Sequence, residues 1–280
     1  MRDLCEIFRR QAGAVWNRMD KAAGLGMSLN EETITEITSF EMAHAVLGIS
    51  GFQVRLATKP EEVLHGADWE WWLVRDGIGV GYRVQAKRLF NTGRYKHLFK
   101  SPNRLSQANT LISAANSDGM VPLYCLFNLP GPTKSHWLPT RDCAHSYRGL
   151  SRWGCALMDA NHLVKWPSNK FSDLLDYSRP WHELVCVGGR SDTLPSAAAR
   201  FSNFLRRLPG PDGAVLDLPS VEPRRVPDRI ARMLESDLRG RARDGTAAYL
   251  SDDEVVEVDS RWVPNDVAGV VVLEDVRDEE

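Results

Sequence analysis

Hydrophobic and polar positions recur with two different periods along this chain, and the changes of period outline its elements. A period of 3.6 residues predicts amphipathic helices over residues 3–22, 102–118, 193–208 and 227–243. Asn30, a typical N-cap residue, predicts the start of a further helix over residues 30–48. Period-two alternation or a short apolar run predicts strands over residues 52–58, 67–75, 80–88, 121–128, 181–187, 254–258 and 269–273. Residues up to 128 therefore read as two helices, a strand, a hairpin, a helix and a further strand.

Proline and glycine divide the chain near residue 209. Pro209-Gly210-Pro211-Asp212-Gly213 opens a proline-rich stretch, which predicts a linker over 209–226. The expected organisation is a core over 1–208 and a C-terminal α+β appendage over 227–280 that ends in an acidic tail.

Composition narrows the class of protein. With 280 residues, 43% of them hydrophobic, the chain can bury a substantial core. A net charge of −2 means that any nucleic-acid binding must be local. The chain has no apolar run of eighteen residues and no signal-peptide pattern, so we expect a cytoplasmic protein without a membrane segment.

Cysteine and histidine show no spacing typical of a metal site. The cysteines are odd in number and far apart, which suits reduced thiols: Cys5, Cys125, Cys143, Cys155 and Cys186. Five scattered histidines match no ligand motif and are interpreted as structural groups: His65, His136, His145, His162 and His182.

The predicted hairpin at 67–88 concentrates the candidate chemistry. Successive strand side chains point to opposite faces, so Asp68 and Glu70 share one face of the first strand. Arg83, Gln85 and Lys87 share one face of the second strand. If these two polar faces coincide, Asp68 lies across from Gln85 and Lys87. The alternative is a surface hairpin whose polar residues face solvent.

These residue types suit metal-dependent attack on a phosphodiester. Mg²⁺ prefers oxygen ligands and keeps several waters, so Asp68, the backbone carbonyl of Ala86 and the substrate phosphate could hold it. Mn²⁺ would serve equally. The metal lowers the pKa of a bound water. Gln85 can add a side-chain carbonyl, and Lys87 can orient the water or stabilise charge on the phosphate.

Asp68, sixteen residues, and then Gln85-Ala86-Lys87 resemble the D-x(n)-Q-x-K variant of the PD-(D/E)XK nuclease superfamily, found in Mrr-like restriction endonucleases. The GADWEWW and QAKR segments also resemble small uncharacterised bacterial proteins often suspected of antiphage defence. The resemblance covers roughly residues 28–190. It implies an α/β restriction-endonuclease-like core, a mixed sheet flanked by helices, in which a Glu-bearing helix precedes three antiparallel strands.

Gln85 departs from the superfamily's usual pattern, because many members carry Asp or Glu there. The resemblance implies that a glutamate of the first helix compensates. Glu31, Glu32 and Glu36 are the candidates, and we choose Glu32, with Glu36 one turn further on the same face. The competing interpretation is that acidic residues merely favour the start of a helix.

Two further residues are possible supports of the site. Glu70 shares the face of Asp68, but an ion pair with Arg83 or Arg88 is the preferred interpretation. Gln107 lies off the apolar stripe of its helix and resembles the polar residue that family members project toward the site. A solvated glutamine is the alternative.

The segment 88–100 is basic and aromatic, which suits phosphate attraction and stacking. Its candidate nucleic-acid contacts are Arg88, Arg94, Lys96 and Lys100. An ordinary exposed loop would have the same composition.

The sequence thus predicts a metal-dependent endonuclease that acts on nucleic acid, with DNA favoured over RNA. An RNase using the same residues, and an inactive nucleic-acid-binding or assembly subunit on the same fold, are the alternatives. Homo-oligomerisation and a defence-system partner protein stay open.

Overall fold

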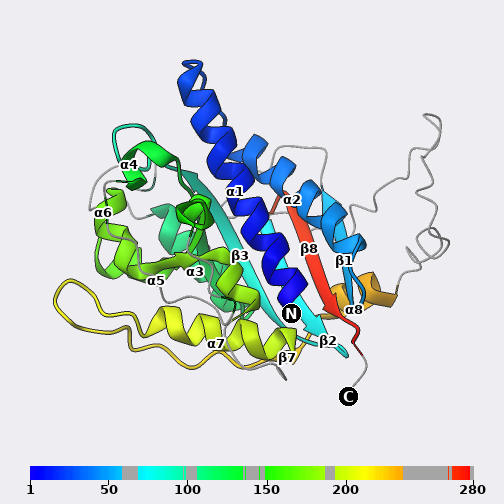
Figure 1. Ribbon diagram of the computed structural model, residues 1–280. Helices are drawn as coiled ribbons and strands as arrows, with labels where there is room; N and C mark the ends of the chain where they lie inside the picture. The colour runs from blue at the N-terminus through cyan, green and yellow to red at the C-terminus, as the bar shows by residue number, and fades with distance from the viewer. Residues whose placement is uncertain are drawn as a thin grey trace.

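Figure 1 shows the computed structural model of the chain, a mixed β-sheet with helices on both faces. The structure describes residues 1–58, 69–96, 98, 106–134, 136, 145, 149–186, 193–235, 264 and 267–277. Everything said below about the structure concerns these residues.

The sheet has eight strands in the order β1-β8-β2-β3-β4-β5-β6, with β7 paired to β3. Strands β2 and β3 are antiparallel, whereas β8 runs parallel to β2 and β4 parallel to β3. The strands are β1 (Phe52–Thr58), β2 (Trp69–Arg75), β3 (Ile78–Arg88), β4 (Val121–Phe127), β5 (Cys155–Asp159), β6 (Ser178–Pro180), β7 (Arg224–Arg225) and β8 (Gly269–Asp275). This mixed sheet flanked by helices confirms the predicted α/β class.

Helices cover the two faces of the sheet unequally. The long α1 (Arg2–Gly24) and α2 (Glu31–Leu47) lie across one face, and α3 (Ser106–Ser117) lies on the other (Figure 1). The remaining helices are α4 (Pro130–Lys134), α5 (Ala160–Lys165), α6 (Phe171–Leu174), α7 (Leu194–Arg206) and α8 (Asp228–Glu235), with 3-10 helices η1 (Leu150–Gly154), η2 (Leu175–Tyr177) and η3 (Trp181–Val185). None of the described helices combines the length and the apolar character that a membrane span requires.

The β2–β3 hairpin forms where the sequence predicts it. Arg75 pairs with Ile78, which leaves Asp76 and Gly77 as a two-residue loop. Both have positive φ, 50° and 72°, as a type I′ turn requires, and Asp-Gly is a favoured pair there. The turn therefore sets the register of the candidate site's two strands.

The other predicted elements that fall on described residues are confirmed to within a few residues, but the run 181–187 is not a strand. The predicted strand 254–258 lies outside the described residues. Residues Trp181–Val185 form the 3-10 helix η3, which packs on α1 through the tilted rings of Phe8 and Trp181, whose centroids are 4.8 Å apart. The Trp181 indole also donates to the Phe8 carbonyl at 2.6 Å. A short apolar run fits either a buried strand or a buried helix, and here contact with α1 decided the outcome.

The expected C-terminal appendage is corrected for residues 269–275. Strand β8 lies inside the sheet, antiparallel to β1 on one side and parallel to β2 on the other. The three-strand antiparallel order implied by the nuclease resemblance is therefore interrupted between β1 and β2. The physical reason is burial on both faces, since a continuous run such as Val270–Leu273 suits a central strand.

The predicted linker at 209–226 is attached to the core at several points, with Val221 and Val226 buried. Asn203 of α7 exchanges two hydrogen bonds with the backbone of Val221, and Arg206 donates to the carbonyl of Pro219. Strand β7 then joins the start of β3. The segment leads the chain back to the sheet. As a result, α8 and β8 belong to the same core as the preceding elements.

Candidate functional site

The polar side chains of β2 and β3 share one face of the sheet, as the alternation predicts. The register places Glu70 opposite Arg83, and Trp69 opposite Val84 on the other face. Gln85 and Lys87 continue the face of Arg83 toward the end of β3. We refer to Glu70 and Arg83 as the inner pair, and to Gln85 and Lys87 as the outer pair.

The inner pair is held by residues from other parts of the chain. The Glu70 carboxylate is fully buried and accepts hydrogen bonds from the Trp72 indole and from Arg229 of α8. Arg83 donates to Asp118, just after α3, at 2.7 Å. Glu70 and Arg83 are thus cross-strand neighbours that pair with different partners. Glu70 does form a structural ion pair, but its partner is Arg229 and not the predicted Arg83 or Arg88.

Trp72 can reach Glu70 in this way because β3 has a glycine opposite it. A Cβ built on Gly81 would lie 2.6 Å from the Trp72 ring. The missing side chain leaves room for the indole to lie across β3. Any larger residue at position 81 would displace Trp72 and, with it, one donor to Glu70.

The outer pair is also buried. Gln85 is 4% exposed and Lys87 is 7% exposed, so neither is the solvated residue of a surface hairpin. Burying an ammonium group is costly unless an anion compensates it. Within the described part of the chain, no carboxylate lies within ion-pair distance of Lys87. Asp68, the residue directly before β2, lies outside the described residues.

A glutamate of α2 does reach the strand that carries the outer pair. The Glu31 carboxylate accepts from the backbone N–H of Arg88 at 3.4 Å. Leu89 N–H donates to Phe127 of β4, so the Arg88 N–H points to the opposite edge of β3, the edge facing β2. Glu31 therefore lies at the edge of β3, beyond Trp69, the first residue of β2.

Glu32 and Glu36 lie elsewhere on the helix and are exposed. Glu31 is in phase with the buried Thr35 and Thr38, three and four residues apart along the sheet-facing side. Hydrophobic periodicity did not indicate this side, because the sheet-facing side of α2 carries Thr35, Thr38 and Ser39 whereas the apolar Phe40 is exposed. The structure therefore brings Glu31 to β3 and leaves our first choice, Glu32, facing solvent.

The backbone of Ala86 completes the set of oxygen atoms at this edge. Its carbonyl lies two residues before Arg88 and, by the alternation of an extended strand, faces the same edge as the Arg88 N–H. The Ala86 side chain faces α2, in a small apolar cavity that Thr35 and Thr38 also line. Glu31 and the Ala86 carbonyl thus offer two oxygen ligand atoms beside the outer pair, a chemistry suited to Mg²⁺ or Mn²⁺.

Two cations of the basic segment that begins at the end of β3 lie against one aromatic ring. The Arg88 guanidinium lies 3.9 Å from the centroid of Phe90, and the Lys96 ammonium lies 4.1 Å from it. Arg94 donates to Asn169 at 2.8 Å and is exposed. Lys100 lies outside the described residues. Three of the four predicted nucleic-acid contacts therefore belong to one short, described segment.

Buried Tyr95 anchors this segment to the core. Its hydroxyl donates to the Asn128 side chain at 2.5 Å, and Asn128 donates in turn to the carbonyl of Trp153. Burial raises the pKa of Tyr95, so the hydroxyl stays protonated and keeps its donor role. The segment is thus attached to the sheet at Leu89, which forms a β-bridge with Tyr95.

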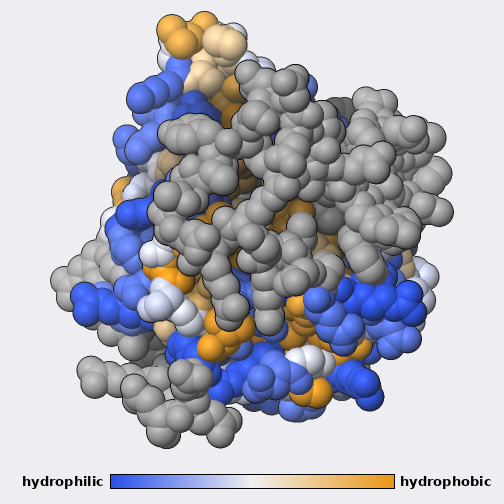
Figure 2. Space-filling view, turned by 90° about the vertical axis from the view of Figure 1, so that its right-hand side faces the viewer, coloured by the Kyte–Doolittle hydropathy of each residue, from blue (hydrophilic) through white to orange (hydrophobic). Residues whose placement is uncertain are grey.

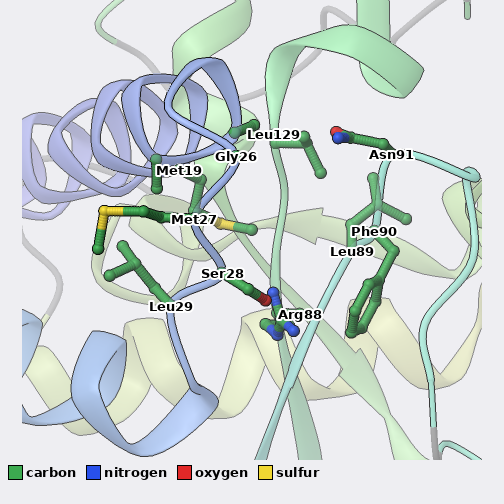
Figure 3. A pocket seen from close by; sticks show the side chains of 12 residues that line it. Met19, Gly26, Met27, Ser28, Leu29, Arg88, Leu89, Phe90, Asn91 and Leu129 are labelled. Atoms are coloured by element: carbon green, nitrogen blue, oxygen red, sulfur yellow. The ribbon is translucent and has the colours of Figure 1, made fainter.

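A pocket of about 190 Å³ opens beside this segment (Figure 3). Its wall is formed by the end of α1, the connection to α2 and the end of β3, with Ser28 and Arg88 among its polar side chains. The exposed Leu25 and Met27 follow α1, and Figure 2 shows hydrophobic residues at that end of the molecule. The pocket adjoins Glu31 through Leu29, so it lies next to the candidate metal-binding edge.

Gln107 lies near the start of the described part of α3 and is half-buried. Ala108, Leu111 and Ala115 form the buried side of this helix, as the apolar stripe predicts. The described residues show no contact between Gln107 and the outer pair, so its supporting role stays a prediction.

Comparison with known proteins places the chain in a family but attaches no activity to it. No curated protein and no solved structure matches it. One family model, described as a family of unknown function, matches residues 4–276. That range runs from the start of α1 through β8, so the family covers the whole sheet and the segment 209–226 that leads back to it. The chain belongs to this family of unknown function, DUF6615.

Proposed function

We propose that the chain is a metal-dependent nuclease of the PD-(D/E)XK type, with DNA as the favoured substrate. The observation that carries the proposal is the meeting of Glu31 with β3 at 3.4 Å, beside the buried Gln85 and Lys87. Glu31, 57 positions before Arg88, would then supply the helix carboxylate with which the Gln variant of the motif usually compensates.

In the proposed site, the carboxylates of Asp68 and Glu31 and the carbonyl of Ala86 would hold Mg²⁺ or Mn²⁺. The ion would activate a water and neutralise charge on the scissile phosphate. Gln85 orients the groups around the phosphate, and Lys87 supplies the positive charge that stabilises the pentacovalent transition state. Arg88, Arg94 and Lys96 attract the neighbouring phosphates.

A plasmid-nicking assay with the purified chain tests this directly. Cleavage is expected with Mg²⁺ or Mn²⁺ and is expected to stop with EDTA. Asp68→Ala should abolish cleavage and leave thermal unfolding unchanged; full activity in this variant would overturn the assignment.

A matched series on α2 tests the choice of glutamate. Glu31→Gln should lower cleavage strongly, whereas Glu32→Gln and Glu36→Gln remove exposed carboxylates of the same helix and serve as controls. Loss of activity in Glu32→Gln alone would restore our first choice from the sequence.

The second candidate is a nucleic-acid-binding subunit without catalysis. Gln85 favours it, because the usual carboxylate at this position of β3 is missing. If the wild-type chain retains DNA or RNA in a gel-shift assay but cleaves neither with any divalent ion, this second function replaces the first. Cleavage of RNA alone would keep the mechanism and change the substrate.

A further inference from the structure

A second group of ligand-type side chains lies outside the proposed nuclease site. Cys5 belongs to the first turns of α1, Cys186 directly follows η3, and His145 comes from the segment between β4 and η1. The two sulfur atoms and one ring nitrogen of these residues lie within 4.8 Å of one another. The Cys186 Sγ and the His145 Nδ1 are 3.0 Å apart.

We infer that Cys5, His145 and Cys186 form a binding site for a soft divalent metal ion, with Zn²⁺ as the best fit. Two thiolates and an imidazole are a donor set that zinc prefers. With Zn–S near 2.3 Å and Zn–N near 2.0 Å, tetrahedral ligand atoms lie roughly 3.5–3.8 Å apart. The observed cluster is close to this spacing, so small side-chain movements suffice for all three to reach one ion.

The backbone around the cluster is set by contacts that do not involve the three ligand-type side chains. Phe8, one helical turn after Cys5, packs its ring at a tilt against Trp181, and its carbonyl accepts a hydrogen bond from the Trp181 indole. Cys186 is placed by its backbone hydrogen bond to Glu183 at 3.1 Å. The two thiols are therefore held face to face by the packing of α1 on η3, which lowers the cost of organising a site.

Burial also fits a metal site. Cys5 is fully buried and Cys186 is 7% exposed, whereas His145 is half-buried. An ion could enter from the side of His145 and leave one coordination position to water. Binding displaces the two thiol protons, because thiolate is the form that ligates. The ion would join the start of α1 to η3 and to the segment of His145.

This site is distinct from the proposed nuclease site. The pocket next to Glu31 is lined by residues at the far end of α1, from Met19 onward. Cys5 and Ala22 are separated by about 26 Å along the helix, at 1.5 Å per residue. The inferred metal is therefore structural and does not depend on Asp68 or Lys87.

Metal content of the full chain tests the inference. Reduced protein is mixed with equimolar Zn²⁺, passed through a desalting column and analysed by mass spectrometry for metal. We expect about one zinc per chain, and below about a tenth of that in Cys5→Ser, His145→Ala and Cys186→Ser, since three-ligand sites lose most of their affinity with one ligand. Cys155→Ser, a buried cysteine of β5 outside the cluster, should keep the wild-type value.

Cobalt substitution supplies a readout that does not depend on stability. Co²⁺ bound by thiolates gives a charge-transfer absorption, expected in wild type, in Cys155→Ser and in Asp68→Ala, and lost in His145→Ala. His145→Ala is the variant expected to disturb the fold least, because His145 is half-buried whereas Cys5 and Cys186 are buried. Three results would each overturn the inference. The first is a wild-type chain without zinc, and the second is the same zinc content in the cluster variants as in Cys155→Ser. The third is a Cys5–Cys186 disulfide in the freshly purified protein.

Discussion

The inner pair and the outer pair are neighbours on one sheet face, yet their surroundings differ. Glu70 and Arg83 are bound by side chains from α8 and from the end of α3. Gln85 and Lys87 lie where β3 continues past the described part of β2, next to a glutamate that reaches the strand's edge. Alternation along a strand locates a polar face, but the segments that pack on each part of it determine what that part can do.

The difference has a physical basis. A buried carboxylate that receives two donors is stabilised in place, and its geometry is determined by the fold. A buried lysine with no described carboxylate within ion-pair distance is instead suited to bind an anion such as phosphate. The inner pair therefore should govern stability, and the outer pair should govern the proposed activity.

The largest expected effect comes from Lys87→Met, which tests the outer pair. Methionine keeps most of the side-chain volume and removes the charge. We expect the rate of plasmid nicking to fall by about 10²–10³-fold, the effect of removing one group that stabilises transition-state charge. Thermal unfolding should change little. Lys21→Met, at an exposed lysine of α1, is the control. A normal nicking rate in Lys87→Met would contradict the proposal that the outer pair, and not the inner pair, governs the activity.

Glu70→Gln tests the inner pair by stability. The amide keeps the shape of the side chain but weakens its bonds to Trp72 and Arg229. We expect a loss of about 1.5–3 kcal/mol in the free energy of unfolding, the range for buried hydrogen bonds to a charged group. Urea denaturation measures it, with Glu36→Gln as the exposed control. If Glu70→Gln instead stops cleavage at unchanged stability, Glu70 belongs with the outer pair.

Arg229→Met sharpens the same comparison with a smaller effect. The Arg229 side chain is 27% exposed, so solvent screens its ion pair with Glu70. We expect a loss of about 1 kcal/mol, and the double variant with Glu70→Gln should lose less than the sum of the two. Additive losses in urea denaturation would show that α8 does not act through Glu70.

The pH of these measurements matters because of buried His162. Burial lowers the pKa of His162, whose Nε2 lies 2.9 Å from the carbonyl of Leu205 and whose ring stacks on Tyr177. The unfolded chain then binds more protons than the folded one below about pH 6.5, the ordinary histidine value. Stability from this group is present above that pH and is lost as the pH falls toward the lowered pKa.

His162→Gln should therefore flatten the decline of stability between about pH 6.5 and pH 5, since glutamine does not titrate there. Urea denaturation at several pH values measures the slope. His44→Gln, at an exposed histidine of α2, should keep the wild-type slope. An unchanged slope in His162→Gln would assign the acid sensitivity to other groups.

Several features of the site were predictable because they depend on local chemistry. The Asp76-Gly77 turn and period-two alternation set the register that places Glu70, Gln85 and Lys87 on one face. The choice of Glu31 over Glu32 was not predictable in this way, because the sheet-facing side of α2 carries several polar residues. The insertion of β8 between β1 and β2 could not be predicted from spacing. A strand far along the chain pairs at the place where its apolar residues are best buried.

The sequence by itself determined the class of the fold, the hairpin and the composition of its polar face, since turn geometry and side-chain periodicity act over a few residues. Only the tertiary structure decided that Glu31 meets β3, that Arg229 binds Glu70, and that Cys5, His145 and Cys186 come together. Each of these depends on the packing of helices or of a returning strand against the sheet. Such contacts join residues whose separation in the chain carries no signal of their proximity.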